Sequence, residues 1–123
     1  MRETADKLRE LEQNIAKEKG SFRLFGLFLR EDAPDLWDLV VSATWIMDDK
    51  KDALTYISQK MREALTPEEL LKISRIVVIE KENPALDALH KAIKTEHAMA
   101  EIQNSNFFGL QIKHAYLITS KRA

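Results

Sequence analysis

The chain has 123 residues, of which 45% are hydrophobic, and a formal net charge of −1. This length suits one domain, and this hydrophobic fraction is typical of folded rather than disordered chains. The absence of cysteine excludes disulfides, zinc–thiolate sites, iron–sulfur clusters and a cysteine nucleophile.

We expect neither a targeting segment nor a membrane span. Residues 1–20 are charged throughout and contain no apolar core of a signal peptide. The apolar stretches 25–29 and 39–43 are far shorter than the about 20 residues that a membrane-spanning helix needs. The sequence therefore predicts a cytoplasmic protein that does not contact membranes. We expect one domain over residues 1–123.

Residues 1–20 predict an amphipathic helix. Leu8, Leu11 and Ile15 recur at spacings of three and four, and Gly20 is a natural helix stop. The apolar stripe is narrow, so the helix either lies on a sheet or pairs with another helix. In the second case these three side chains are the candidate contacts of a homodimer.

Two strands follow, joined by a polar turn over residues 31–35. The first strand, 21–30, has apolar residues at both odd and even positions, so both of its faces should be largely buried. Gly26 in its middle predicts a bulge or a close approach of another segment. The second, 36–44, has one continuous apolar face. The short connection predicts an antiparallel hairpin.

Capping signals define the middle of the chain. Asp48 or Asp49 is the expected N-cap of a helix that runs to Leu65. Thr66 and Glu69 then form a capping-box pattern that opens a short helix.

A buried strand over residues 76–79 comes next. Asn83 precedes a proline and caps a helix that extends to about Thr95. The last quarter predicts a short strand over 99–103, a polar loop over 104–106 and a longer strand over 108–119. The last two strands should pair antiparallel.

The predicted elements alternate in the order α-β-β-α-α-β-α-β-β. This order predicts an α+β (mixed α/β) fold with a single mixed sheet of about five strands and helices packed on it.

An acidic cluster is one candidate site. Asp32, Asp35 and Asp38 lie in and after the first turn, and Glu80 ends a later strand. Converging carboxylates at strand ends are how magnesium-dependent hydrolases and nucleases hold their metal. The alternative interpretation, solvated turn residues and a strand-face carboxylate, is the one we favour.

The last two strands carry a second candidate site. Asn104, Asn106, Lys113, His114 and Tyr116 could together bind a small anionic ligand. The competing interpretation is a turn followed by a structural polar pair on the strand.

Other chemistry has little support in the sequence. Only three glycines are present, so neither a dinucleotide fingerprint nor a P-loop can be built. His90 and His97 are two helical turns apart, about 10 Å, which is too far to share one metal ion without further ligands. We expect no metal and no cofactor.

We therefore expect a non-catalytic interaction or structural domain that self-associates, as a homodimer. The charge balance argues against nucleic acid as a partner, while another protein partner stays open. The metal-dependent hydrolase or nuclease and the small anionic-ligand sensor are the alternatives.

Overall fold

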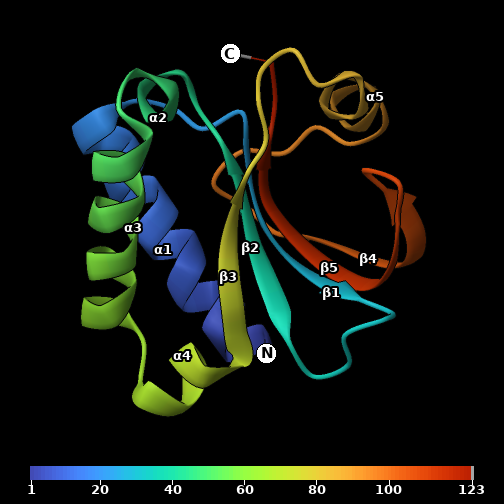
Figure 1. Ribbon diagram of the computed structural model, residues 1–123, viewed down its shortest axis with the longest axis horizontal. Helices are drawn as coiled ribbons and strands as arrows, with labels where there is room; N and C mark the ends of the chain where they lie inside the picture. Colours follow the sequence, from blue (N-terminus) through green and yellow to red (C-terminus); the bar gives the residue numbers. More distant parts are fainter. Residues whose placement is uncertain (123) are drawn as a thin grey trace.

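The computed structural model describes residues 1–122. It is an α+β fold in which helices pack on a single mixed sheet of strand order β3-β2-β1-β5-β4 (Figure 1). The elements are α1 (Arg2–Lys19), β1 (Leu24–Arg30), β2 (Trp37–Ser42), α2 (Thr44–Asp48), α3 (Lys50–Ala64), α4 (Pro67–Lys72), β3 (Ile73–Val78), α5 (Pro84–Ala92), β4 (Ala100–Phe107) and β5 (Leu110–Ser120). Only β2 and β3 pair in parallel, because α3 and α4 carry the polypeptide back between them.

The predicted hairpin of the first two strands is confirmed, with Phe25 opposite Val41 and Leu29 opposite Trp37. The predicted irregularity at Gly26 is also confirmed. The register between β1 and β5 shifts between Phe25 and Gly26, and the backbone of Tyr116 approaches closely there. A side chain at this position would collide with the neighbouring strand.

The predicted second strand is too long at its end. β2 stops at Ser42, and residues 44–48 form α2 instead. The next helix, α3, has Asp49 as its N-cap, and the Asp49 carboxylate accepts a hydrogen bond from the Asp52 N–H at 3.2 Å. Local apolar pattern alone does not distinguish a strand end from a short helix.

The capping predictions at α4 and α5 are confirmed. Thr66 Oγ1 accepts the Glu69 N–H at 3.2 Å, and Glu69 Oε1 accepts the Thr66 N–H at 2.9 Å. Asn83 caps α5, which ends at Ala92, three residues earlier than expected. These polar residues satisfy backbone N–H groups that the first helical turn leaves without partners.

The predicted loop over residues 104–106 is wrong. These residues lie within β4, and the hairpin turns at Phe108 and Gly109, which have φ of 56° and 74°. The hairpin bends instead at Asn104, whose φ is 51°. Asparagine tolerates this left-handed conformation in a bend as it does in a turn, so its presence alone does not distinguish the two.

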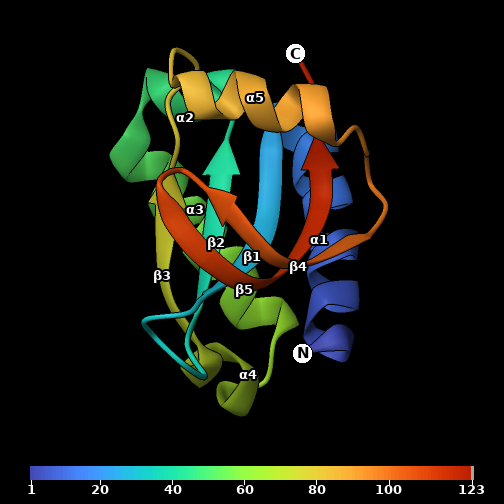
Figure 2. The same ribbon diagram turned by 90° about the vertical axis from the view of Figure 1, so that its right-hand side faces the viewer.

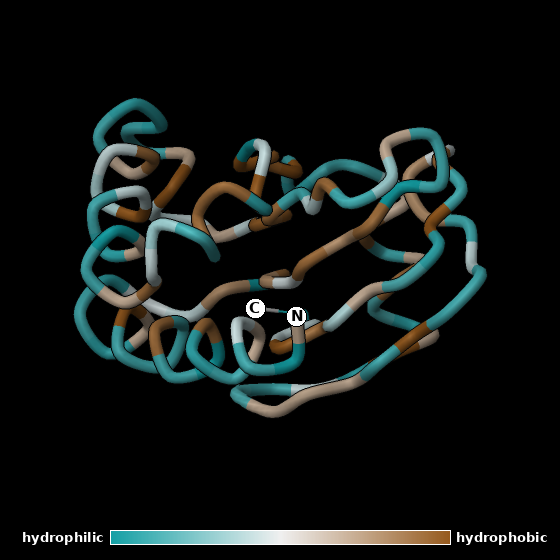
Figure 3. The backbone as a smooth tube through the Cα atoms, turned by 90° about the horizontal axis from the view of Figure 1, so that it is seen from below, coloured by the Kyte–Doolittle hydropathy of each residue, from teal (hydrophilic) through white to brown (hydrophobic). Residues whose placement is uncertain are grey.

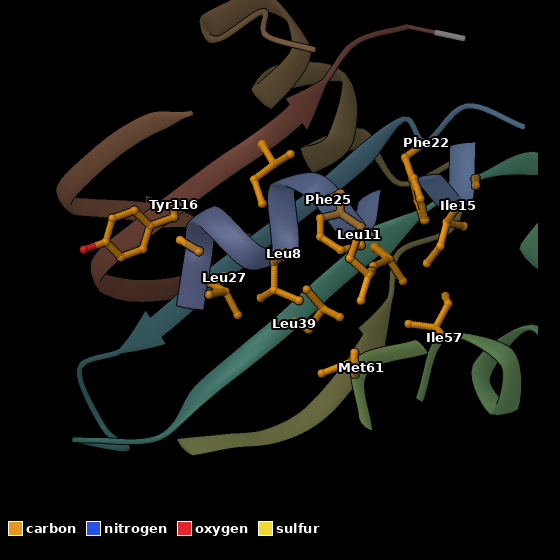
Figure 4. Close-up of a cluster of buried hydrophobic side chains, with 14 of the residues drawn as sticks. Leu8, Leu11, Ile15, Phe22, Phe25, Leu27, Leu39, Ile57, Met61 and Tyr116 are labelled. Carbon is orange, nitrogen blue, oxygen red and sulfur yellow. The ribbon is translucent and has the colours of Figure 1, made fainter. Parts of the chain in front are cut away.

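The two faces of the sheet carry separate cores. The first face holds Phe25, Leu27 and Leu39 against α1 and α3 (Figures 1 and 4). On the second face, α5 and the curled β4–β5 hairpin cover Phe28 and Leu117 (Figure 2). The hydropathy-coloured trace shows apolar positions along the strands in the middle and hydrophilic outer helical turns (Figure 3).

Candidate functional site

The apolar stripe of the first helix lies inside the molecule. Leu8, Leu11 and Ile15 are 0%, 6% and 1% exposed and point from α1 onto the sheet and α3 (Figure 4). They are core residues rather than surface residues. The expectation that they contact a second subunit is therefore corrected, because the helix uses its only apolar face to bury the sheet.

Asp38 belongs to a charge network rather than to an open acidic cluster. Its carboxylate is 3.3 Å from Arg30 Nε, and it accepts hydrogen bonds from Arg75 Nε and Nη2 at 3.1 and 3.2 Å. The Ser74 hydroxyl also donates to Asp38 Oδ1, at 3.1 Å. Two guanidinium groups thus compensate a carboxylate that is nearly buried.

The other three carboxylates are not brought to one point. Asp32 is an exposed residue 3.8 Å from Arg30 Nε, and Asp35 lies in the turn with φ of 68°. Glu80 follows the end of β3, whereas this turn precedes the start of β2, and the two strands are parallel. Glu80 is therefore at the opposite end of the sheet. Within residues 1–122, no group of three or more His, Asp or Glu residues could hold a metal ion.

His114 and Tyr116 do lie together. Their rings are 4.7 Å apart, and each is 5.6 Å from the ring of Trp37. His114 Nε2 is 2.7 Å from Glu101 Oε1, and Arg2 lies 3.6 Å from the same carboxylate. Burial and the Glu101 charge raise the pKa of the Tyr116 hydroxyl, while Arg2 opposes this rise.

The remaining residues of the second candidate site lie at the bend of the hairpin or beyond it. Asn104 and Lys113 face each other between the pairs Gln103–His114 and Ser105–Ile112, and Lys113 falls in a bulge of the β1–β5 pairing. Asn106 is opposite Gln111 in the far arm, where both are exposed. The structure therefore gathers His114 and Tyr116 but not the three residues expected beside them.

One buried polar network escaped the sequence interpretation. Glu12 is fully buried on the inner face of α1, 2.5 Å from His97 Nδ1, and accepts the Thr119 hydroxyl at 2.8 Å. Its spacing of four from Leu8 places it on the apolar stripe, and this is the signal that could have revealed it. The network joins three parts of the molecule: α1 through Glu12, the segment before β4 through His97, and β5 through Thr119.

A broad groove separates the outer surfaces of α1 and α3. Its volume is about 640 Å³, and lysines and glutamates of both helices line it. Tyr56 donates its hydroxyl proton to Glu18, and burial together with Glu18 raises the pKa of Tyr56 to about 12. The ammonium groups of Lys19 and Lys60 lie 4.9 and 5.5 Å from the Tyr56 ring centre. Charges of both signs therefore line this groove.

The edge strand β3 combines partly exposed apolar side chains with an adjacent groove that is mainly apolar. Ile76, Val77, Val78 and Ile79 are all partly exposed, and β3 ends the sheet on this side. Between β3 and α3 lies a groove of about 370 Å³, whose apolar lining consists of Leu54, Met61, Leu70, Ile73 and Ile76.

The opposite edge strand, β4, is different. Its exposed positions carry Glu101, Gln103 and Asn106, and the bend at Asn104 interrupts its regular geometry. Polar residues and bends are the usual protection of an edge strand against pairing with another polypeptide. The two edges of the sheet are therefore not equivalent.

Comparison of the sequence and structure with protein-family models, curated proteins and solved structures finds no match in any of the three. Over residues 1–122, every helix is too short or too polar to cross a membrane.

Proposed function

We propose that this protein is a non-catalytic interaction domain that forms a homodimer by antiparallel pairing of two β3 strands. The observation that carries the proposal is the run Ile76–Val77–Val78–Ile79 at the sheet edge, which is uncharged, β-branched and partly exposed. Such an edge is a template for strand addition.

The orientation of the backbone supports this pairing. The Ile79 N–H donates to the Val41 carbonyl of β2 at 2.9 Å. Because alternate residues of a parallel strand direct their peptide groups to opposite sides, Val77 also faces β2, while Ile76 and Val78 face the free edge. A second strand can therefore bond to Ile76 and Val78 without disturbing the existing sheet.

A second copy matches this edge because antiparallel pairing is symmetric. A twofold axis at Val77 pairs Ile76 of each copy with Val78 of the other, which supplies four backbone hydrogen bonds. In this register Arg75 lies opposite Ile79 of the other copy and Glu80 lies opposite Ser74, so no like charges are directly opposed. Parallel pairing would place like charges together.

The groove between β3 and α3 adds apolar area to this interface. Leu71, next to the start of β3, is 79% exposed, the most exposed large apolar side chain in residues 1–122. In the antiparallel dimer, segments of the second copy that flank its β3 would cover this groove. A stable interface needs about 1,000 Å² or more of buried surface, which two edge strands alone do not provide.

The two alternatives have less support. The hydrolase or nuclease hypothesis needs converging carboxylates, and Asp38 is instead held by Arg30 and Arg75, with Glu80 at the other end of the sheet. The sensor hypothesis at the last strand pair finds its five residues divided: His114 and Tyr116 lie together, while Asn104, Asn106 and Lys113 are placed elsewhere on the hairpin.

Light scattering coupled to size-exclusion chromatography tests the dimer. We expect a dimer mass for the wild type at about 1 mM. Val77→Lys apposes two ammonium groups at the twofold axis and should give a monomer. Asn106→Lys adds the same charge on the opposite edge strand and should leave the dimer intact.

Val77→Lys also places a charge near the second core, so its fold must be checked by circular dichroism. Ile76→Pro is the second variant, since proline removes an N–H that faces the free edge and spares the bonds to β2. A wild-type protein that stays monomeric at about 1 mM would contradict the proposal. So would folded dimers of both variants.

A further inference from the structure

A basic pocket is lined by residues of α5 and of the segments beside it. In Figure 1, α5 and the end of β5 lie at the end of the molecule opposite the β1–β2 turn. The volume of the pocket is about 420 Å³. Three separate segments supply its cations: Arg23 precedes β1, Lys81 lies in the loop before α5, and Arg122 follows β5. Glu82 and Asp87 are the carboxylates of its lining.

Arg23 is held in place by its backbone. Its N–H donates to the Ser42 carbonyl at 2.7 Å, and its own carbonyl accepts the Lys121 N–H at 3.1 Å. The same carbonyl lies 2.8 Å from Nε2 of His90, a buried residue of α5 that also lines the pocket. The main chain at Arg23 therefore ties β1, β2, β5 and α5 together and fixes the origin of the side chain.

The Arg23 guanidinium makes no ion pair and no hydrogen bond with residues 1–122. The residue is only 8% exposed. The ion pairs among residues 1–122 use other cations, namely Arg2, Lys7, Arg30, Arg75, Lys121 and two histidines. The side-chain hydrogen bonds of the same residues likewise include none from the Arg23 guanidinium.

The Arg23 guanidinium ends in the open pocket. Among residues 1–122 no buried side-chain nitrogen or oxygen lacks a hydrogen-bond partner, so a guanidinium without a protein partner must reach solvent, and the pocket in front of it is open. Asp38, a buried charge, is instead surrounded by two arginines and a serine. A guanidinium cannot lose its proton, so Arg23 offers a permanent positive charge to a ligand in this pocket.

We propose that this pocket binds the phosphate group of a small molecule, with Arg23 as the fixed ligand at its base. The side chains of Lys81 and Arg122, both exposed residues, approach the same space from two other segments. A tetrahedral phosphate presents oxygens to donors on several sides, whereas a planar carboxylate presents two oxygens in one plane. Three cations from three segments therefore favour phosphate. Glu82 and Asp87 limit the excess positive charge and restrict which anions enter.

Thermal unfolding in the presence of inorganic phosphate tests this site. We expect phosphate up to about 20 mM to raise the unfolding temperature of the wild type saturably by several degrees, beyond sodium chloride of equal ionic strength. Arg23→Met keeps the length and apolar stem of the side chain and should abolish this rise. Arg9→Met removes an exposed arginine of α1 and should leave the rise unchanged.

The phosphate-free proteins provide an independent readout. If Arg23 exists for a ligand, Arg23→Met breaks no hydrogen bond or ion pair within residues 1–122 and should unfold close to the wild-type temperature. If Arg23 is only structural, the variant should unfold several degrees lower, and this result would overturn the proposal. A phosphate response that is absent or persists in Arg23→Met would overturn it as well. Saturable stabilisation by acetate or citrate but not by phosphate would overturn the assignment of the ligand class.

Discussion

Glu12 illustrates how a single charged residue can organise the core. Its carboxylate is fully buried and is satisfied by His97 and Thr119, which come from the last quarter of the sequence. A buried carboxylate that keeps both partners costs little, whereas one that loses a partner is strongly destabilising. The network therefore fixes α1 on the sheet only as a complete set.

Replacing His97 by alanine should lower the free energy of unfolding by about 3 kcal/mol, because the Glu12 carboxylate stays buried without its main partner. The matched control is His114→Ala, since His114 pairs with Glu101, whose side chain is 40% exposed. That loss should be about 1 kcal/mol. Urea unfolding measures both values, and an equal loss in the two variants would contradict this account.

Glu69 makes stability depend on acid pH. Hydrogen bonds from Lys7, from the Thr66 N–H and from Thr4 lower the pKa of Glu69 from 4.5 to about 2. Because the folded protein binds this proton less readily than the unfolded one, the stabilisation is complete above pH 4.5 and is lost as pH falls toward 2.

Glu69→Gln tests this dependence. The stability difference between wild type and variant should be largest above pH 4.5 and should shrink steadily toward pH 2. Unfolding temperatures measured by circular dichroism across this range check the trend. A difference that stays constant or grows on acidification would show that the Glu69 charge is not what joins α1 to α4.

At the scale of elements, the central strand β1 depends on close contact with β5. A Cβ atom at Gly26 would lie 2.9 Å from both the Leu117 Cδ2 atom and the Tyr116 carbonyl oxygen. The Tyr116 contact is with backbone, so it can be relieved only by moving a strand in the middle of the sheet.

Gly26→Ala should therefore cost about 2 kcal/mol of unfolding free energy. Gly109→Ala is the control, since Gly109 has open space around it and only its φ of 74° opposes a side chain. We expect about 1 kcal/mol there. Chemical denaturation gives the unfolding free energies of both variants. A smaller loss for Gly26→Ala than for Gly109→Ala would mean that β1 and β5 can move apart at little cost in free energy.

Local signals in the sequence predicted elements well where one residue type has one physical role. The capping box at Thr66, the proline behind Asn83 and the glycine of β1 each marked a boundary or an irregularity. Prediction failed where a residue type serves two roles. Asn104 marks a bend within a strand rather than a turn, and the apolar residues after Ser42 form a helix.

Sites were harder to predict than elements because they depend on contacts distant in sequence. The partners of Asp38 include Arg75, and the partner of Glu12 is His97, pairs that only the strand order and the helix docking reveal. Alternation along β5 does not identify one core face, since Ile112 and Tyr116, both at even positions, belong to opposite cores on either side of a register shift. Arg23 has no distinguishing sequence pattern at all.

At the scale of the whole molecule, one edge of the sheet is protected and the other is not. β4 presents polar side chains and a bend, while the run from Ile76 to Ile79 presents four apolar β-branched residues. The start of β3 carries a register irregularity near Ser74 and the charge of Arg75, which limit pairing there. The proposed dimer uses only the part of the edge that lacks these features.

Amide hydrogen exchange followed by NMR at two protein concentrations tests the β3 dimer most directly. At about 1 mM, the amides of Ile76 and Val78 should be protected because they bond to the second copy. At about 10 μM, they should exchange much faster, while the amides of Val77 and Ile79, bonded to β2, should stay protected. Concentration-independent fast exchange of Ile76 and Val78 would contradict the pairing of two β3 strands.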